Sequence, residues 1–397
     1  MQRLPFSGAT TLRFEGPLSV GHVEGAASPV GESMPVGEGP RIRAVWPSES
    51  HVARTDFESP APVGTSIRRE RSEWNSAAVT YAEFGDALVH LPTGVLISGR
   101  HLWCDASVAT VLNAQGRVRG IDFFVLGETY FRIVGHGETE PERLNRPAMV
   151  LGFWASYTNY GHWLANSLLS VYFVLDRLQI GELALVCPPL SKRQFEDLFA
   201  LGVPKSAIVE TSAQYVRGEI LYPSALSTST NVYPGSWAAS FFSFLKQRLG
   251  SDGETGAKRV YLSRRKFAGS GRVMSNEDVL IARLAHLGFL CADPHELDMA
   301  GQMRLMSQAQ IVVGQFGAAL WNLGFAPRGC AVVEITVDAY AGAEFLFLSS
   351  LLGLRFVRVM ASAGISAADA GRGRVFSFEA PVDDILAVVR CLLEQRA

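Results

Sequence analysis

The stretch that decides the fold covers residues 258–335 and reads KRVYLSRRKFAGSGRVMSNEDVLIARLAHLGFLCADPHELDMAGQMRLMSQAQIVVGQFGAALWNLGFAPRGCAVVEI. Short apolar segments typical of buried strands alternate in it with segments whose apolar residues have helical spacing. A cluster of arginines follows the first strand, and a glycine loop follows the strand at residues 311–313. This alternation predicts a parallel sheet with helices on both faces. In such open sheets, ligands bind at the carboxyl ends of the strands.

The same alternation continues to residue 360. The expected strands lie at residues 259–263, 289–292, 311–313, 331–335 and 356–360. The expected helices lie between Ser275 and Gly288 and at residues 299–308, 317–323 and 344–352. In the tail, apolar residues recur at positions i, i+3, i+4 and i+7, which predicts an amphipathic helix.

Composition divides the chain into four predicted parts. Residues 1–75 are rich in Gly, Pro and Ser and predict an irregular, β-rich N-terminal arm. Residues 76–249 are rich in strands and then become helical, which predicts a first domain of mixed strands and helices. A polar, glycine-rich linker at residues 250–256 precedes a second domain at residues 257–375, which contains the predicted parallel sheet, and the amphipathic helix at residues 381–396 ends the chain.

The bulk numbers exclude several classes of protein. The chain has 397 residues, 48% of them hydrophobic, and a net charge of −2, so no overall basic field predicts nucleic acid as a partner. Its five cysteines form no CxxC pair, which favours reduced thiols over disulfides or a metal site. Neither a signal peptide nor a run of ~20 apolar residues is visible, so we expect a cytoplasmic protein without a transmembrane segment.

Three features of residues 258–335 could carry chemistry. Arg264, Arg265 and Arg272 follow a predicted strand, and arginine binds phosphate in a bidentate manner. The small residues of the loop at residues 314–319 open a helix, whose N-terminus can bind phosphate through backbone N–H groups. Glu334 ends a strand, where its carboxylate can accept hydrogen bonds from a ribose. The alternatives stay open at this point: a basic surface loop, an ordinary tight turn and a cap for a neighbouring loop.

These pieces together resemble the family 61 glycosyltransferases. The matches in the second half are Ser263-Arg264, Arg272, Asn276-Glu277, Gln302, Gly314-Gln315-Phe316-Gly317-Ala318, Leu320, Asn322 and Glu334-Ile335. The match in the first half is Asn159-Tyr160-Gly161-His162-Trp163-Leu164. The resemblance covers roughly residues 148–360, and it does not cover the predicted arm.

The resemblance implies a GT-B arrangement, in which two Rossmann-like domains face a cleft. It also implies an inverting, metal-independent transfer of a sugar from a nucleotide sugar, with a UDP-linked donor as the default and no cofactor. The sequence contains no Asp-x-Asp, a motif that binds metal and diphosphate in other glycosyltransferases. The residues expected at the donor are Arg264, Arg265, Arg272, Gly314, Phe316, Gly317, Ala318, Asn322 and Glu334.

An inverting transfer needs a base that deprotonates the acceptor hydroxyl, and His162 is the candidate. The neighbouring residues expected on the acceptor side are Asn159, Tyr160, Trp163 and Asn166. The alternative for His162 is a structural role at the start of a helix. The expected acceptor is a glycan or a lipid-linked glycan, as in bacterial surface polysaccharide synthesis. The donor sugar, peripheral contact with a membrane and the oligomeric state stay open.

Departures from the family pattern occur in both motifs, and Leu169 and Ser170 replace a common proline and arginine. Asn166 stands where many relatives have an acidic residue, and Phe316 stands where the donor loop usually has a histidine. Neither side chain can do what the usual residue does, so a catalytically inactive binding or scaffold protein is the second hypothesis. A third, an epimerase or dehydrogenase, is disfavoured because no GxGxxG follows an early strand.

Overall fold

The computed structural model describes residues 9–11, 19–22, 41–46, 49–54, 66–68, 71–76, 79–92, 94–98, 101–104, 117–118, 121–126, 128–136, 140–151, 159–223, 227–228, 231–232, 234–250, 257–265, 272–338, 342–362 and 376–395. Much of the predicted arm and residues 251–256 of the predicted linker lie outside these ranges. The chain folds into two compact units. The first unit comprises Met1–Ser48 and Ala77–Val232, and the second unit comprises Glu49–Ser76 and Tyr233–Ala397.

The second unit is built on a six-stranded sheet in the order β22-β20-β23-β24-β25-β5. Its strands are β22 (Leu290–Ala292), β20 (Arg259–Leu262), β23 (Ile311–Gln315), β24 (Ala331–Thr336), β25 (Arg355–Met360) and β5 (Ile67–Arg68). All neighbours run parallel except β5, which pairs antiparallel with β25. The two central strands β23 and β24 are buried along their whole length, as expected of a parallel sheet covered on both faces.

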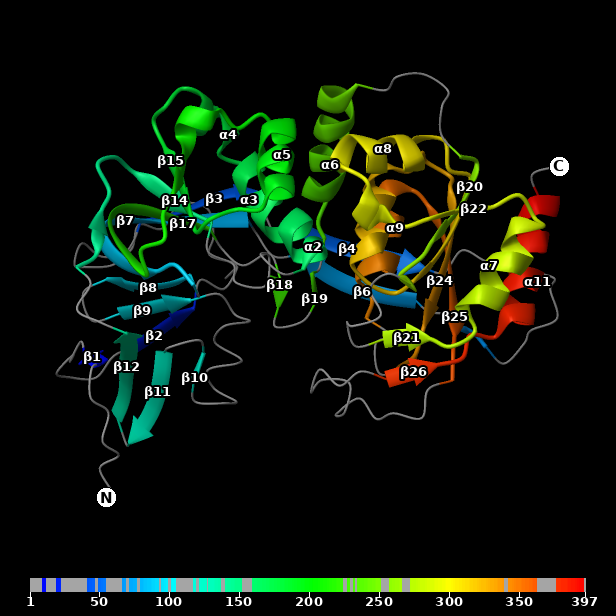
Figure 1. Ribbon diagram of the computed structural model, residues 1–397, viewed down its shortest axis with the longest axis horizontal. Coiled ribbons are helices and arrows are strands. Elements are labelled where there is room, and N and C mark those ends of the chain that lie inside the picture. The colour runs from blue at the N-terminus through cyan, green and yellow to red at the C-terminus, as the bar shows by residue number, and fades with distance from the viewer. Residues whose placement is uncertain are drawn as a thin grey trace. The chain divides into compact units, whose positions relative to one another are not determined.

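Helices cover both faces of this sheet (Figure 1). On one side lie α7 (Glu277–Ala285) and α11 (Val382–Glu394), which share an apolar core with the strands. On the other side lie α6 (Trp237–Leu249), α8 (Met299–Ser307), η6 (Ala318–Phe325) and α9 (Glu344–Leu352). The tail helix α11 buries its apolar stripe against the sheet.

Two smaller strand pairs complete the second unit. β21 (Arg272–Met274) pairs parallel with β26 (Phe376–Phe378). β4 (Glu49–Arg54) pairs antiparallel with β6 (Arg71–Ser76). In this second pair, Trp74 stacks on Phe347 of α9 with ring centroids 4.1 Å apart. Strands from the first 75 residues therefore pack on the core of the second unit.

The first unit has a mixed sheet in the order β16-β15-β14-β17-β7-β8-β9-β2, with β13 beside β17 and β3 beside β7. The strands are β16 (Ile208–Glu210), β15 (Ala184–Cys187), β14 (Ala148–Val150), β17 (Tyr215–Pro223), β7 (Val79–His90), β8 (Val95–Ser98), β9 (His101–Cys104), β2 (Ser19–His22), β13 (Glu142–Arg143) and β3 (Arg41–Trp46). The four strands β16, β15, β14 and β17 run parallel to their neighbours. β7 pairs antiparallel with β17. A second, antiparallel sheet contains β1 (Ala9–Thr11), β12 (Glu128–His136), β11 (Ile121–Leu126) and β10 (Arg117–Val118).

The helical part of the first unit follows β14. It contains α2 (Tyr160–His162), the π-helical segment η2 (Trp163–Leu168), α3 (Leu169–Tyr172), α4 (Leu175–Gln179), α5 (Lys192–Leu201) and η3 (Lys205–Ala207). The short antiparallel pair of β18 (Ser227–Thr228) and β19 (Asn231–Val232) ends the first unit. The 3-10 helix η5 (Pro294–Glu296) belongs to the second unit. The chain is thus a mixed α/β protein with several parallel sheets, which is compatible with a Rossmann-like fold.

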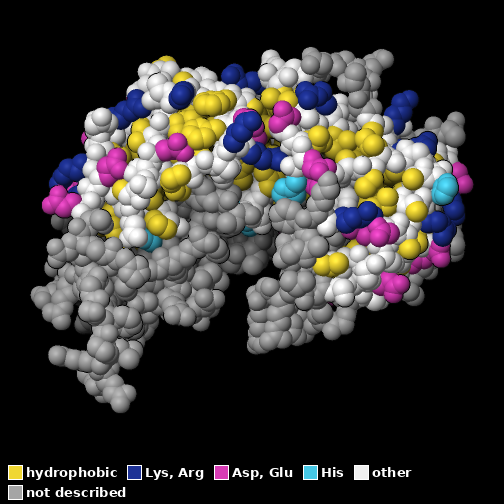
Figure 2. All heavy atoms as spheres, in the orientation of Figure 1, with side chains coloured by type: hydrophobic (Ala, Val, Ile, Leu, Met, Phe, Trp, Pro, Cys, Tyr) yellow, Lys and Arg dark blue, Asp and Glu magenta, His cyan; other side chains and the backbone are white. Residues whose placement is uncertain are grey.

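Charge is spread over the described surface. On the face that Figure 2 shows, the Lys and Arg side chains are interspersed with Asp and Glu, without a large field of one sign among the coloured residues. In the part of the chain that the structure describes, no helix combines the length and the apolar composition that a membrane span requires.

Candidate active site

Two arginines and a glycine come together at the carboxyl edge of the second unit's sheet. Arg264 lies two residues beyond β20, and Gly317 lies two residues beyond the neighbouring strand β23. Gly317 has a φ of +148°, which side chains rarely tolerate. A Cβ atom there would collide with Nη1 of Arg264 and would lie 3.1 Å from Nη2 of Arg272. Both guanidinium groups therefore approach the backbone of Gly317, and only glycine leaves room for them.

Arg264 is held at two points, one on its guanidinium and one on its backbone. Its Nη1 donates to the carbonyl oxygen of Phe316 at 3.3 Å, and its backbone N–H donates to Oε1 of Glu277 at 3.3 Å. Burial lowers the pKa of Arg264, while the charges of Glu277 and Asp293 act in the opposite direction. Because arginine stays protonated in proteins, the site contains a partly desolvated cation. Such a cation attracts an anionic ligand more strongly than an exposed one does.

Phe316 supports the second arginine. The guanidinium carbon of Arg272 lies 5.3 Å from the centroid of the Phe316 ring, within the range of a cation–π contact. The ring of Phe316 is buried and stands edge-on to Phe345, with centroids 5.4 Å apart. A phenylalanine at this position can therefore position Arg272, although it cannot donate a hydrogen bond to phosphate.

Arg265 differs from the other two arginines. Its side chain is 55% exposed and pairs with the carboxylate of the exposed Asp278. The predicted cluster therefore separates into two arginines that approach Gly317 and one that forms a surface ion pair.

A pocket of about 140 Å³ lies beside the arginines. It is lined by Arg264, Arg265, the segment Arg272–Ser275, Glu277, Asp278 and Gln315. The pocket thus joins the ends of β20 and β23 to β21 and the first turn of α7. All three predicted phosphate-binding arginines line it.

The other predicted donor residues have roles within the fold. Gly314 lies in β23, where an added Cβ would be 3.0 Å from Cδ2 of Leu320. Ala318 is half-buried at the start of η6, a 3-10 helix. Asn322 is buried, and its Nδ2 donates to the carbonyl oxygen of Ala319 at 3.0 Å. The contacts of Gly314 and Asn322 fix the shape of the loop and the helix that follow β23.

Glu334 forms a buried ion pair. Its side chain is fully buried in β24, and its Oε2 accepts from Nε of Arg358 at 2.6 Å. Nη2 of Arg358 also donates to the carbonyl oxygen of Gly342 at 2.5 Å, which fixes the chain just before α9. The geometry gives Glu334 a structural partner, and contact with a ribose stays a prediction.

Glu344 was not singled out by the sequence, and it is the first residue of α9. Its side chain is buried, and Oε2 has no hydrogen-bond partner within the described ranges. Burial raises the pKa of Glu344 to about 7, although Arg358 and Arg272 favour its ionised form. Its only sequence signal was a carboxylate at the start of a predicted helix, which normally indicates a favourable charge at a helix N-terminus.

His162 and Asn166 form a pair in the first unit. Nδ2 of Asn166 lies 3.1 Å from Nδ1 of His162, and Asn166 is buried in η2. Burial lowers the pKa of His162, so the imidazole is neutral near pH 7. A neutral imidazole can accept a proton, which is the first requirement of a general base.

The remaining acceptor-side residues hold this helix in place. Oδ1 of Asn159 accepts from the backbone N–H of Gly161 at 3.0 Å and caps α2. The guanidinium of Arg193 lies 4.5 Å from the ring centroid of Tyr160. Trp163 is buried and donates through Nε1 to Oδ2 of Asp197 at 2.9 Å. These contacts position His162, while contact with an acceptor stays a prediction.

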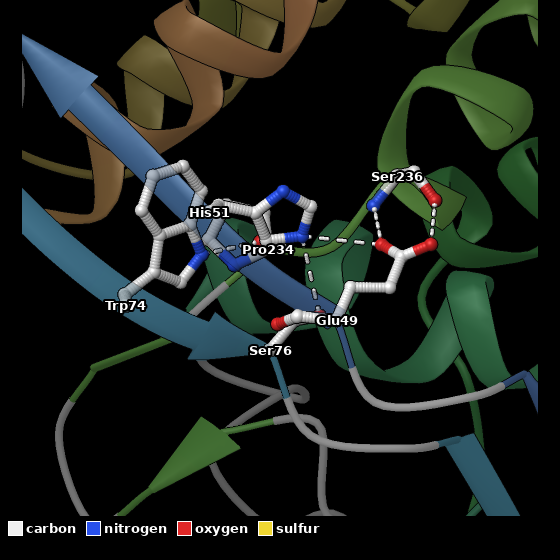
Figure 3. Close-up of polar contacts among 6 residues, drawn as sticks. All are labelled: Glu49, His51, Trp74, Ser76, Pro234 and Ser236. Atoms are coloured by element: carbon white, nitrogen blue, oxygen red, sulfur yellow. Dashed lines mark hydrogen bonds and ion pairs between the residues drawn. The ribbon is translucent and has the colours of Figure 1, made fainter.

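A second cluster in the second unit contains residue types used in hydrolytic triads (Figure 3). Nε2 of His51 lies 3.1 Å from Oε2 of Glu49 and 3.5 Å from Oγ of Ser76. A triad needs one ring nitrogen for each partner, and here the same nitrogen faces both. Glu49 also accepts from the backbone N–H of Ser236 at 2.8 Å and from its hydroxyl at 2.5 Å. The cluster therefore anchors β4 to the start of α6.

The described residues contain no group of three or more His, Cys, Asp and Glu side chains that could hold a metal ion. Comparison with curated proteins gave no match. Residues 160–333, which include His162, Arg264 and Gly317, match the model of the family Glycosyltransferase 61, and this match supports a glycosyltransferase enzyme.

Proposed function

We propose that the protein is an inverting, metal-independent glycosyltransferase of the GT-B type. It moves a sugar from a nucleotide sugar, with a UDP-linked donor as the default, to a glycan acceptor in bacterial surface polysaccharide synthesis. The observation that carries the proposal is the approach of two guanidinium groups, those of Arg264 and Arg272, to the backbone of Gly317. This arrangement lies at the carboxyl edge of a parallel sheet, where such folds bind ligands.

The proposed reaction breaks the bond between C1 of the sugar and an oxygen of the diphosphate. The electron pair stays on the diphosphate, whose leaving oxygen gains negative charge. Arg264 and Arg272 stabilise that charge with fixed, partly desolvated cations, a role that a divalent metal fills in other enzymes. Cations that are held in place before the reaction need little reorganisation as the charge develops.

The acceptor hydroxyl attacks C1 from the opposite side, which inverts the configuration, and its proton passes to His162. For this, Nε2 of the neutral imidazole must carry the lone pair, so Nδ1 must carry the proton. Nδ1–H would then donate to an amide oxygen of Asn166, which requires the amide of Asn166 to be turned by 180°. Amide orientation and histidine tautomer are assigned from the hydrogen-bond network. Oδ1 of Asn166 has no other partner in the described part of the chain, and it can take this place.

Binding of nucleotides with and without EDTA tests the function. We expect one nucleoside diphosphate, and its sugar conjugate, to raise the melting temperature, because a ligand that binds only the folded state stabilises it. EDTA should leave the shift unchanged, and radiolabelled or mass-detected transfer should proceed in its presence. Loss of the shift in EDTA would contradict metal independence. The absence of a shift with every nucleotide would contradict the donor site.

Replacing Asn166 with aspartate should move the pH profile of transfer. The wild-type pKa of His162 is lowered by burial, so the base stays unprotonated down to mildly acidic pH. A carboxylate next to Nδ1 favours the imidazolium, and such a charge typically shifts a pKa by ~1–3 units. The acidic limb of kcat against pH should therefore move to higher pH. Asn166→Ser is the matched control without charge, and an unchanged limb in Asn166→Asp would remove His162 from the proton transfer.

One observation favours the alternative of a binding or scaffold protein. At position 166 the side chain next to His162 is an uncharged amide, which gives the imidazolium no opposite charge. On this alternative the protein binds a nucleotide sugar without transferring the sugar, and His162→Gln leaves that binding unchanged.

A further inference from the structure

Gln315 stands out among the residues that line the pocket. It is the last residue of β23, its side chain is 3% exposed, and its Nε2 has no hydrogen-bond partner within the described ranges. A second buried glutamine of the same unit, Gln302, provides a comparison. Nε2 of Gln302 donates to the carbonyl oxygens of Pro294 at 2.8 Å and Leu297 at 3.1 Å. Gln302 therefore has a structural task, whereas no residue in the described part of the chain gives one to the amide nitrogen of Gln315.

A buried amide without a partner destabilises the fold, because it loses its hydrogen bonds to water and gains nothing in return. Buried polar groups in folded proteins nearly always have partners, and each exception needs an explanation. A methionine would fill the same space beside the pocket without this cost. The position of Gln315 at a pocket explains the exception if a ligand supplies the missing acceptor.

The groups around the pocket indicate the charge of that ligand. Three guanidinium groups line the pocket, and its two carboxylates are already engaged. Glu277 accepts from the hydroxyls of Tyr261 at 3.0 Å and Ser263 at 2.8 Å, and Asp278 pairs with Arg265. An N–H donor beside arginines suits an anion with several acceptor oxygens, as a phosphate has.

We propose that Gln315 is a phosphate-binding residue of the donor site, whose amide N–H₂ donates to a phosphate oxygen of the nucleoside diphosphate. This proposal rests on the proposed function, and it adds a neutral donor to the two arginines that approach Gly317. The side chain would thereby distinguish a phosphate oxygen, which accepts the hydrogen bond, from a group of the same shape that cannot accept one.

Titration calorimetry with inorganic pyrophosphate and with UDP tests the proposal on Gln315→Met. We expect both affinities to fall by about tenfold to a hundredfold, as for a hydrogen bond to a charged group. The melting temperature of the unliganded variant should stay the same or rise, because an unpartnered amide has been removed. Gln302→Met is the matched control, and there the melting temperature should fall while both affinities stay within about twofold.

A second variant, Gln315→Glu, keeps the shape and replaces the donor with an acceptor, and it should bind pyrophosphate more weakly than Gln315→Met does. Unchanged binding of both probes by the Gln315 variants, with binding lost in Arg264→Gln, would overturn this inference and leave the proposed function standing. A loss for UDP alone would overturn the phosphate contact. If the wild-type protein bound neither probe, both the proposed function and this inference would fail.

Discussion

Replacing Arg264 with glutamine is expected to slow sugar transfer by about 10²- to 10³-fold, the usual effect of removing one preorganised donor from an active site. Arg264 is the arginine whose Nη1 lies against Gly317 and donates to the carbonyl oxygen of Phe316. Glutamine keeps much of the length and removes the positive charge. Initial rates at saturating and at low donor concentration measure the loss in kcat and in kcat/KM separately.

Arg265→Gln is the matched control for this experiment. The two arginines are adjacent in the sequence, and the same charge is removed in both variants. The Arg265 side chain is largely exposed and pairs with Asp278, an interaction that contributes ~0–1 kcal/mol to stability. We therefore expect Arg265→Gln to retain transfer within a few-fold of the wild type. Equal losses in the two variants would mean that the field of the whole cluster matters and that the position of Arg264 does not.

Stabilisation of the developing charge should act on the transition state more than on the bound donor. If so, kcat falls together with kcat/KM in Arg264→Gln, while the affinity for the intact donor changes less. A variant that lost only donor affinity would indicate that Arg264 stabilises the bound donor and the transition state equally. A variant with unchanged kcat and KM would contradict the assignment of Arg264 to the donor site.

The parallel sheet of the second unit could be predicted from the sequence. Its strands are short, continuously apolar and separated by helices, and the order of such elements determines where the carboxyl ends of the strands lie. That is why Arg264 and Gly317, 53 positions apart in the sequence, could be expected at one edge. Their approach in space agrees with that expectation.

Local patterns could not separate residues with the same chemistry. Sequence patterns do not distinguish Arg264 from Arg265, because only the backbone decides which of the two turns towards the loop after β23. They also select Glu334, whose carboxylate is engaged by Arg358 from the next strand, β25. Glu344, at the start of α9, resembles in the sequence any carboxylate at a helix N-terminus. Pairing between distant residues is absent from local periodicity, so these distinctions required the structure.

For the same reason, the sequence does not predict where the N-terminal strands pack. A Gly-, Pro- and Ser-rich region predicts turns and short strands, but it does not say which core the strands cover. β4 and β6 lie in the second unit because Trp74 stacks on Phe347 and donates through Nε1 to the carbonyl oxygen of Pro234 at 2.9 Å. Both partners are more than 150 positions away from Trp74 in the sequence, so a local pattern cannot predict these contacts.

Glu344 links the stability of the second unit to pH. Burial raises its pKa from 4.5 to about 7, and the positive charges of Arg358 and Arg272 only partly oppose this. In the unfolded chain the carboxyl is exposed and has an ordinary pKa. Because the folded pKa is the higher one, the folded state binds the proton more tightly. Its contribution to stability is fully present below about pH 4.5 and is lost as the pH rises through about 7.

Replacing Glu344 with glutamine should therefore stabilise the protein at pH 8 and change little at pH 5. Glutamine imitates the neutral carboxylic acid, and a shift of this size corresponds to ~3 kcal/mol at a pH above both pKa values. Urea unfolding of both proteins at pH 5 and pH 8 measures the difference. Glu394→Gln, at the exposed end of α11, is the matched control and should have nearly the same small effect at both pH values. An equal effect of Glu344→Gln at pH 5 and pH 8 would show that the carboxyl of Glu344 does not titrate in this range.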